Sequence, residues 1–341
     1  MNRQHRLRAP HQTQGHSSIE VLESRIAPAT FVVLNLNDSG AGSLRDAIDQ
    51  ANTLGGPDTI VFHAGLHGTI ALSSGQLRIT DEVTIDGPGG NKIILDGLNQ
   101  SRVFLIDDGT STDRPATLSG LTIIDGNSTG DTAFTPAGGG IVSTESLTLK
   151  NCVISGNTSV TNTVDGNGGG VAVFSENASV NIVDSQITNN VGDTGGGLYL
   201  YAGKSITING SKILNNHGRG FGGGGASVQS YVTVSSDIVV ENTLFQGNTS
   251  ETSGGGLSAT HNQGGLTISG CKVIDNTAIS SVGGGMAIVA NGNVVVEKSS
   301  VTNNRSIDDG GGLFCSGSAP IEIVSSKVTG NQLSDAGQEC Y

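Results

Sequence analysis

Residues 195–216, GGGLYLYAGKSITINGSKILNN, contain the two marks that decide the fold of this chain. A glycine triplet followed by an aliphatic residue opens the stretch, and an asparagine three residues after an aliphatic residue closes it. The residue after the triplet recurs as Ile141, Val171, Leu198, Ala226, Leu257, Met286 and Leu313. The asparagine recurs as Asn127, Asn157, Asn190, Asn216, Asn248, Asn276, Asn304 and Asn331. These asparagines are about 29 residues apart on average, a spacing typical of a solenoid.

The residues before each asparagine predict which side chains point inward. Positions ten and eight residues earlier are aliphatic, as in Ile206 and Ile208, and the position three earlier is aliphatic or Phe. The position five earlier is small, and in the first repeat Thr122 and Ile124 are assigned to positions five and three. Inward residues two apart are typical of a strand with one buried face. Between the positions eight and five residues before the asparagine the spacing is three rather than two, which indicates a bend between two strands. A further segment follows the glycines, so three short strands are predicted per repeat.

Three strands restarted in every repeat predict an all-β, single-stranded parallel β-helix in which equivalent residues stack about 4.8 Å apart. A stacked asparagine hydrogen-bonds to its neighbours and tolerates a left-handed φ. Glycine permits positive φ and lets the backbones of adjacent coils approach closely, and the seven triplets hold 21 of the 53 glycines among 341 residues. Glycine-rich loops also cradle phosphates, and asparagine also holds sugar hydroxyls, but the regular recurrence favours the structural interpretation.

The chain divides into three segments. Residues 1–30 hold four basic and two acidic residues and lack an apolar run, so a disordered leader or targeting segment is predicted. Residues 31–116 contain irregular strand-like runs and one helical segment, Ser43 to Leu54, with Leu44 and Ile48 on its apolar face. We expect this helix to cap the N-terminal end of the solenoid. Residues 117–341 contain the regular repeats, which we expect to be truncated because GQE stands where another triplet is due.

Two groups of residues resemble known bacterial families. The segment NDSGAGSLRDAIDQAN resembles the start of bacterial surface β-helix proteins, and the GGG[ILV] and FQGN motifs resemble the repeats of chlamydial polymorphic outer-membrane proteins. The segment from Ile19 to Ala29 resembles the leader of large exported planctomycete and verrucomicrobial proteins. These resemblances imply a right-handed, pectin-lyase-like β-helix outside the cell, which in the chlamydial family is an adhesin-type passenger.

Carboxylate pairs are the first candidates for catalysis, because some enzymes with the implied fold cleave polysaccharides. The adjacent pairs are Asp107-Asp108, Asp308-Asp309 and Asp81-Glu82, but neighbours on a strand point to opposite faces. The scattered candidate bases are Lys150, Lys204, Lys212 and Arg219. We therefore assign no catalytic residue. Three converging carboxylates in a groove, or carboxylates beside an arginine, would favour an enzyme.

No cofactor or metal site is assigned either. The GRGFGG segment at residues 218–223 is followed by another predicted strand rather than the helix of a dinucleotide site. His63 and His67 lie in a strand-and-turn region, where their spacing does not place them on one helical face.

The four cysteines are predicted to contribute no disulfide within the regular repeats. Cys152 and Cys271 share one repeat position but lie four coils apart, about 19 Å at the interstrand spacing, too far to pair. We expect both to be packed free thiols. Cys315 and Cys340 lie on successive coils, two positions out of phase, so pairing them would need a rearranged terminus.

The favoured function is a non-enzymatic β-helix repeat protein, adhesin-like or envelope-structural, that is secreted or lies on the outer-membrane surface. The alternative is a polysaccharide-active lyase or hydrolase, or a carbohydrate-binding β-helix. Expected partners are glycans or proteins on host or neighbouring cells. Nucleic acid is not expected for a chain of net charge −13, and no apolar run is long enough for a transmembrane helix.

Overall fold

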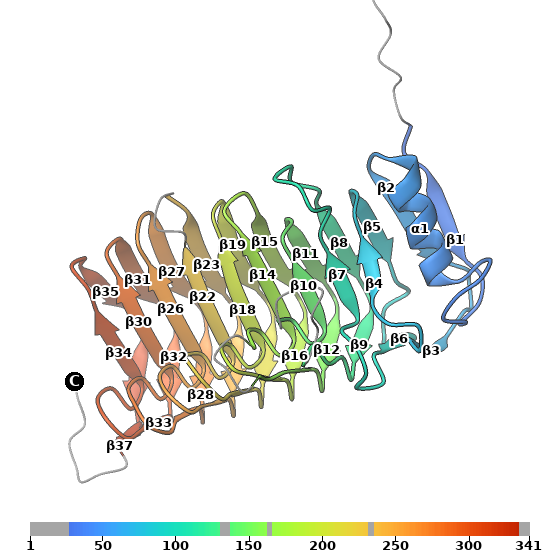
Figure 1. The fold of residues 1–341 in the computed structure, drawn as a ribbon. Helices are drawn as coiled ribbons and strands as arrows, with labels where there is room; N and C mark the ends of the chain where they lie inside the picture. Colours follow the sequence, from blue (N-terminus) through green and yellow to red (C-terminus); the bar gives the residue numbers. More distant parts are fainter. Residues whose placement is uncertain (1–26, 130–136, 162–165, 231–234, 334–341) are drawn as a thin grey trace, which may run out of the picture.

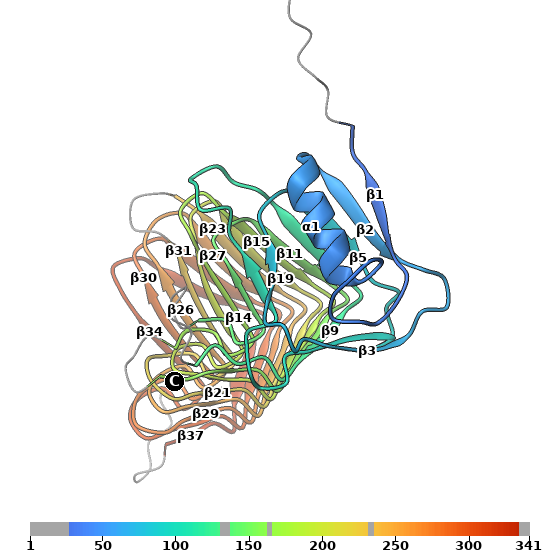
Figure 2. The same cartoon turned by 45° about the vertical axis from the view of Figure 1, so that its right-hand side comes forward.

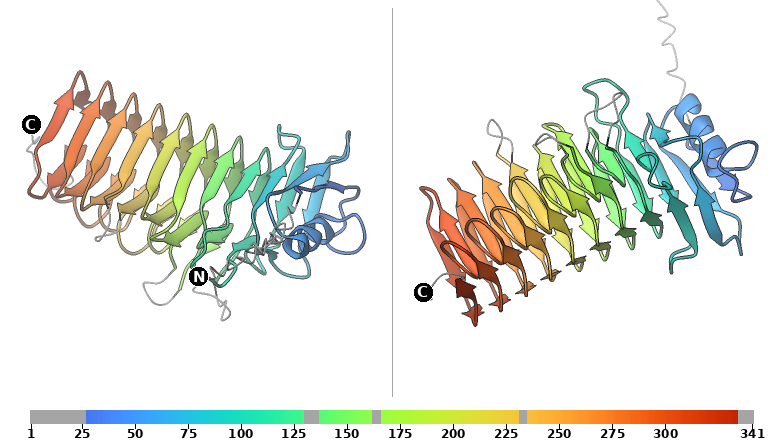
Figure 3. Two further views of the ribbon diagram at one scale, coloured as in Figure 1. Left: turned by 90° about the horizontal axis from the view of Figure 1, so that it is seen from above. Right: turned by 60° about the horizontal axis from the view of Figure 1, so that its bottom comes forward.

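The computed structural model describes residues 27–129, 137–161, 166–230 and 235–333. The chain winds into a right-handed parallel β-solenoid of about ten turns (Figure 1). The predicted leader at residues 1–30 lies almost entirely outside the described residues, although the first strand already starts at Thr30. The coils follow one another in one direction from the N-terminal to the C-terminal end (Figure 3).

Equivalent strands of successive coils form two sheets along the outside of the solenoid, named sheet A and sheet B. Sheet A contains β1 (Thr30–Val33), β2 (Asp58–Phe62), β5 (Val83–Asp86), β8 (Ala116–Ser119), β11 (Leu147–Lys150), β15 (Ser179–Val183), β19 (Ser205–Asn209), β23 (Asp237–Glu241), β27 (Gly265–Ser269), β31 (Asn293–Glu297) and β35 (Ile321–Val324). Sheet B contains β3 (Gly68–Ala71), β6 (Ile93–Asp96), β9 (Thr122–Ile124), β12 (Val153–Ser155), β16 (Gln186–Thr188), β20 (Lys212–Leu214), β24 (Leu244–Gln246), β28 (Lys272–Ile274), β32 (Ser300–Thr302) and β36 (Lys327–Thr329).

Two further sheets complete each coil. Sheet C contains β4 (Leu77–Ile79), β7 (Phe104–Ile106), β10 (Ile141–Ser143), β14 (Val171–Ser175), β18 (Leu198–Ala202), β22 (Ala226–Ser230), β26 (Leu257–His261), β30 (Met286–Ala290) and β34 (Leu313–Ser316). Sheet D contains β13 (Thr158–Ser159), β17 (Val191–Gly192), β21 (His217–Gly218), β25 (Thr249–Ser250), β29 (Thr277–Ala278), β33 (Arg305–Ser306) and β37 (Gln332–Leu333). A regular coil passes through sheets C, A, B and D in that order.

Sheet D is the fourth strand of the regular coil, where the repeat pattern predicted three. Its strands are two residues long and directly follow the ladder asparagine. Two residues show no alternation of apolar and polar side chains, so no periodicity distinguishes them from a turn. The longer strands behave as predicted: Ile206 and Ile208 of β19 and Ile213 of β20 are fully buried.

Seven asparagines form a continuous hydrogen-bonded ladder between sheets B and D. The Oδ1 of Asn216 accepts hydrogen bonds from the backbone N and the Nδ2 of Asn190, both at 3.0 Å. Asn216 in turn donates from the same two atoms to Oδ1 of Asn248, and its Nδ2 also donates to the carbonyl of Ile187 at 2.9 Å. The same pattern joins Asn157, Asn190, Asn216, Asn248, Asn276, Asn304 and Asn331.

Asn127 is not a member of this ladder, and its assignment to the repeat is wrong by one residue. The register pairs Ile154 with Ile123, so Gly126 occupies the ladder position and its N–H donates to Oδ1 of Asn157 at 2.8 Å. Thr122 and Ile124 therefore do not hold the two inward positions assigned to them, which belong to the buried Leu121 and Ile123.

The left-handed residue at this corner is the one before the ladder asparagine, not the asparagine itself. Asn189, Asn215 and Asn303 have φ of 56°, 53° and 58°, each directly before a ladder member. A second left-handed residue lies between sheets A and B, as at Asp184 and Gly210. These two corners explain the predicted bend and the frequency of Asn, Asp and Gly there.

The glycine triplets fit against the ladder. In the triplet Gly195–Gly197, the first residue has φ of 66°. A Cβ on Gly196 would lie 2.3 Å from the carbonyl carbon of His217, and one on Gly197 would lie 3.0 Å from Cγ of Asn216. The triplet thus contains one glycine that needs a positive φ and two glycines beside which there is no room for a Cβ atom.

The helix α1 (Leu44–Leu54) covers the N-terminal end of the solenoid (Figure 2). Ser43 is its N-cap, and its Oγ accepts a hydrogen bond from the N–H of Asp46 at 3.1 Å. Leu44 and Ile48 are buried, as expected for a face packed on β1, β2 and β4. No helix in the described ranges has the length and apolar character that crossing a bilayer requires.

The described cysteines are free thiols. Cys152 and Cys271 are buried at the small inward position, as expected, and burial raises the pKa of Cys271 to about 11. Cys315 is also free, and burial raises its pKa to about 11. Cys340, its considered partner, lies outside the described residues.

His261 is a buried histidine in the interior of the solenoid. It ends β26 with no exposed surface, and its Nδ1 lies 3.3 Å from Oγ of Ser230. Its Nε2 has no hydrogen-bond partner among the described residues. Burial lowers its pKa below the ordinary 6.5, although the carboxylate of Asp237 acts in the opposite direction.

Replacing Asn216 by Ala is expected to lower the free energy of unfolding by about 1–3 kcal/mol for each group it orphans. The backbone N–H of Asn190 is orphaned, and its Nδ2 keeps only the carbonyl of Ile154 as an acceptor. The carbonyl of Ile187 loses its side-chain donor, whereas Oδ1 of Asn248 keeps the hydrogen bond from the backbone N–H at position 216. Urea unfolding followed by circular dichroism measures the change. Asn177→Ala, at an exposed turn position, is the matched control and is expected to keep the wild-type midpoint. Equal midpoints for the two variants would contradict the importance of the ladder.

The stability that His261 contributes is expected to fall as the pH falls below about 6.5. The folded state keeps this ring neutral, whereas the unfolded chain binds a proton there, so acidification favours unfolding. Melting temperatures of the wild type and His261→Gln, compared between about pH 7.5 and pH 5.5, test this. The wild type should lose more stability than the variant, while His63→Gln, at an exposed position, should behave as wild type. If the melting temperatures of the wild type and His261→Gln change equally with pH, the loss of stability in acid does not come from His261.

Candidate functional site

Two of the three adjacent acidic pairs lie at the corner between sheets C and A. Asp81-Glu82 stands between β4 and β5, and Asp107-Asp108 opens the loop between β7 and β8. The third pair, Asp308-Asp309, is exposed many coils away, directly before the last glycine triplet. The tertiary structure therefore joins the first two pairs and separates the third from them.

A group of charged residues, named the corner cluster, gathers there. Nη1 of Arg114 lies 2.7 Å from Oδ1 of Asp81, and its Nε lies 3.6 Å from Oδ2 of Asp108. Nζ of Lys204, three coils further along, lies 2.9 Å from Oδ2 of Asp113. The members of the corner cluster are Asp81, Asp108, Asp113, Arg114, Glu145 and Lys204. Carboxylates beside an arginine are thus present, which is one arrangement that favours an enzyme.

The carboxylates of the corner cluster mainly hold the β7–β8 loop on its neighbours. Asp113 accepts from the N–H and the Oγ of Ser146 at 2.8 and 2.7 Å. Glu145 accepts from the N–H of Arg114 at 2.8 Å, and Asp108 accepts from the N–H and Oγ1 of Thr110. Each of these oxygens fixes a backbone segment of the loop or of the next coil, as carboxylates at turns commonly do.

Two carboxyl groups of the corner cluster have shifted pKa values of opposite sign. Burial raises the pKa of Glu145, which is 3% exposed; the hydrogen bond from Arg114 opposes that shift, and the nearby Asp108 adds to it. Burial also acts to raise the pKa of Asp113, but hydrogen bonds from Ser146 and Lys204 outweigh it and lower the pKa. The cluster therefore contains one carboxyl group with a raised pKa and one with a lowered pKa.

The scattered candidate bases do not converge. Lys150 is exposed on sheet A, Lys212 is exposed on sheet B, and Arg219 is exposed in the segment after sheet D. Lys204 alone reaches the corner cluster, where it pairs with Asp113. Sheets A, B and D lie on different sides of the coil, so these side chains cannot act on one bond.

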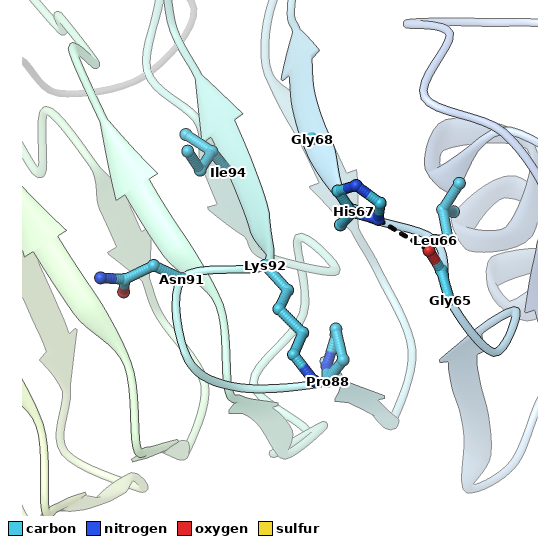
Figure 4. A pocket seen from close by; sticks show the side chains of 8 residues that line it. All are labelled: Gly65, Leu66, His67, Gly68, Pro88, Asn91, Lys92 and Ile94. Carbon is cyan, nitrogen blue, oxygen red and sulfur yellow. Dashed lines mark hydrogen bonds between the residues drawn. The ribbon is translucent and has the colours of Figure 1, made fainter.

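A hollow of about 530 Å³ lies beside the first strands of sheet B. Figure 4 shows Lys92 extending toward Pro88, while Asn91 points away from both. Nδ1 of His67 lies 2.8 Å from the carbonyl of Gly65, and Oδ1 of Asn91 accepts from Oγ1 of Thr122. The polar groups of this hollow are bonded locally or point apart, so it has no common binding centre.

A second hollow of about 720 Å³ is the interior of the last described coil, lined by residues such as Ile321 and Ile323. Among the described residues, no three His, Cys, Asp or Glu side chains lie together as metal ligands. The GRGFGG segment leads from β21 to β22, a strand, as its sequence context predicts.

The outer face of sheet C differs from the other faces in carrying no charge between β10 and β34. Its two outward columns are the second and fourth residues counted from the start of each strand: Val142, Thr144, Ala172, Phe174, Tyr199, Tyr201, Ser227, Gln229, Ser258, Thr260, Ala287, Val289, Phe314 and Ser316. In the first column Val142, Ala172, Ser227 and Ala287 are buried, so the accessible part of the face is the second column together with Tyr199, Ser258 and Phe314. Over the same coils the outward columns of sheet A include Lys150, Asp237, Glu241, Glu297 and Glu322. Those of sheet B include Lys212, Lys272 and Lys327.

Aromatic side chains stand at the middle of this uncharged face. The ring centroids of Phe174 and Tyr199 are 5.1 Å apart at an interplanar angle of 39°. Tyr201 lies in register with Phe174 on the adjacent strand, and all three side chains are half-buried. Figure 1 shows β14 and β18, which carry these residues, side by side in sheet C.

This face was not predicted from the sequence, although the repeats contain a signal for it. Once the triplets are aligned, the second and fourth residues after each triplet are uncharged in every repeat. Because aromatic residues make up only 4% of the chain, their positions drew no attention, although Tyr199 and Tyr201 are two residues apart on one strand and therefore lie on one face.

Comparisons with known proteins concern the fold. A family model described as right handed beta helix region matches residues 62–333. One similar solved structure, described as the crystal structure of pectate lyase Pel9A, is 12% identical, with a TM-score of 0.48, 89% of this chain covered and 80% of that chain. None of the curated proteins matches the sequence. Since the family model spans most of the chain, this protein belongs to the right-handed β-helix family.

Proposed function

We propose that the protein is a non-enzymatic β-helix repeat protein of the secreted or cell-surface kind, acting as an adhesin or as a structural element of the envelope. The observation that carries this proposal is how the corner cluster is bonded. Asp81 and Asp108 both face Arg114, and Asp113 faces Lys204 and Ser146. Groups whose oxygens hold a loop in place are not poised on either side of a scissile bond.

A polysaccharide hydrolase needs a protonated carboxyl group and a second carboxylate that flank the bond to be cleaved. Glu145 is the one member of the corner cluster whose pKa is raised, which is the direction that a proton donor requires. It is almost completely buried, however, and its Oε2 accepts the N–H of Arg114. A lyase needs a base near the substrate, but Lys204 at the corner cluster is paired with Asp113, while Lys150 and Lys212 lie on different sheets. Both points support a role without turnover.

The ladder supports a role in presenting surfaces over a distance. Each ladder asparagine from Asn157 to Asn304 joins its coil to the next with two hydrogen bonds of 2.9–3.0 Å. A solenoid held in this way keeps its outward columns at fixed spacing, which suits repeated weak contacts with a long partner. The resemblance to chlamydial polymorphic outer-membrane proteins supports the adhesin form of the proposal.

Location outside the cell is part of the proposal, supported by the resemblance of residues 19–29 to an exported leader. Protease treatment of intact producing cells tests it, because a surface protein is digested while a cytosolic marker survives. We expect loss of the full-length chain before lysis. Protection in intact cells together with digestion after lysis, and absence from the medium, would refute the location.

Incubation with a polysaccharide panel is expected to yield no products. Ultraviolet absorbance detects the unsaturated ends that lyases form, and a reducing-end assay detects hydrolysis. A pectate lyase on polygalacturonate is the positive control for the absorbance assay. If any glycan is cleaved and Glu145→Gln abolishes the cleavage, the non-enzymatic proposal is wrong and the corner cluster is the active site. Cleavage that survives Glu145→Gln would refute the proposal equally and place the active site elsewhere.

A further inference from the structure

We infer that the outer face of sheet C, between β10 and β30, binds a neutral polysaccharide along the solenoid. This inference rests on the proposed function, of which it names the partner and the surface. It depends on three features of the face: its lack of charge, its aromatic centre and the polar side chains on both sides of that centre.

The lack of charge selects the class of partner. The chain has a net charge of −13, yet no outward position of sheet C from β10 to β34 is acidic or basic. A polyuronate or a sulfated glycan would need cations on this face, and it would be repelled by the protein as a whole. An uncharged glycan needs no cations on the face and is not repelled by the net charge of the protein, so the face is complementary to a neutral glycan.

The aromatic centre provides the apolar contact. Phe174, Tyr199 and Tyr201 project from two adjacent parallel strands, which lie about 4.8 Å apart. Their rings are half-buried, and Phe174 packs against Tyr199, so little conformational freedom is lost when a ligand lies on them. The C–H faces of a neutral sugar ring are apolar and match such a platform, while its hydroxyls stay at the rim.

Polar side chains continue the same outward column on both sides of the aromatic pair. Going along the solenoid from β10, the column reads Thr144, Phe174, Tyr201, Gln229 and Thr260. Oγ1 of Thr144 lies 2.8 Å from Oδ1 of Asp107, and Nε2 of Gln229 lies 3.4 Å from Oγ of Ser227. Hydroxyl and amide groups in line with the rings can bond the hydroxyls of successive sugars.

Affinity gel electrophoresis in gels containing xyloglucan, hydroxyethylcellulose or polygalacturonate tests the inference, with isothermal titration for the glycan that retards the protein. We expect retardation by at least one neutral glycan and none by polygalacturonate. Binding should be unchanged between about 0.05 M and about 0.5 M salt, because no charge takes part. Tyr201→Ala is expected to weaken binding about three- to tenfold, and Tyr201→Phe, which keeps the ring, should retain most of it.

Thr207→Ala is the matched control, because Thr207 lies in the same coil on the outer face of sheet A. It should bind as wild type, and melting curves show whether each variant is folded. If the Tyr201→Ala variant is folded and binds the glycan as the wild type does, the binding site does not lie on sheet C. Equal retardation by polygalacturonate, or strong salt dependence, would overturn the neutral class.

The inference and the proposed function fail in different ways. If neither neutral glycan retards the protein, the inference is overturned. The proposed function is not affected by that result, because it is tested by the absence of cleavage. Cleavage of a bound glycan overturns the proposed function, whatever the binding result. A protein partner that is captured through this face and lost with Tyr201→Ala, without glycan binding, would also overturn the inference.

Discussion

The hydrogen bond from one ladder asparagine to the next is the interaction on which the rest of the structure depends. Its acceptor, the Oδ1 of Asn216, receives two donors from Asn190, and the Nδ2 of Asn216 passes the same arrangement to Asn248. The side chain fills the corner so closely that Gly197 is needed beside it. From Asn157 onward, one buried amide per coil therefore ties each coil to the next and requires the glycine triplet beside it.

This construction separates the interior of the coil from its faces. Inward positions repeat small aliphatic side chains because every coil has the same narrow cross-section. Outward positions bear no such constraint, so each sheet has its own character: charged on sheets A and B, and uncharged with aromatic rings on sheet C. Function in such a fold is a property of columns of outward residues rather than of a single cavity.

The corner cluster illustrates how the same fold can hold charged groups without making a catalytic centre of them. Arg114 and Lys204 neutralise the carboxylates, and the remaining acceptor positions take backbone amides of the β7–β8 loop and of the following coil. The cluster thereby stabilises a long connection at a sheet corner. The uncharged face of sheet C begins beside it, which places the charge-free surface next to the most charged part of the coil.

The parallel coils, the ladder from Asn157 onward and the capping helix could be predicted from the sequence, because each depends on residues at fixed local spacing. Asn127 was misplaced by one residue because Thr122, Ile124 and Asn127 match the repeat pattern. The pairing of Ile123 with Ile154 instead places Leu121 at the small position and Gly126 at the asparagine position. The two-residue strands of sheet D were too short to show a period. The ion pair of Asp81 with Arg114 and the packing of Phe174 against Tyr199 could not be predicted in this way, because they arise when stacked coils bring together residues that are about one repeat apart.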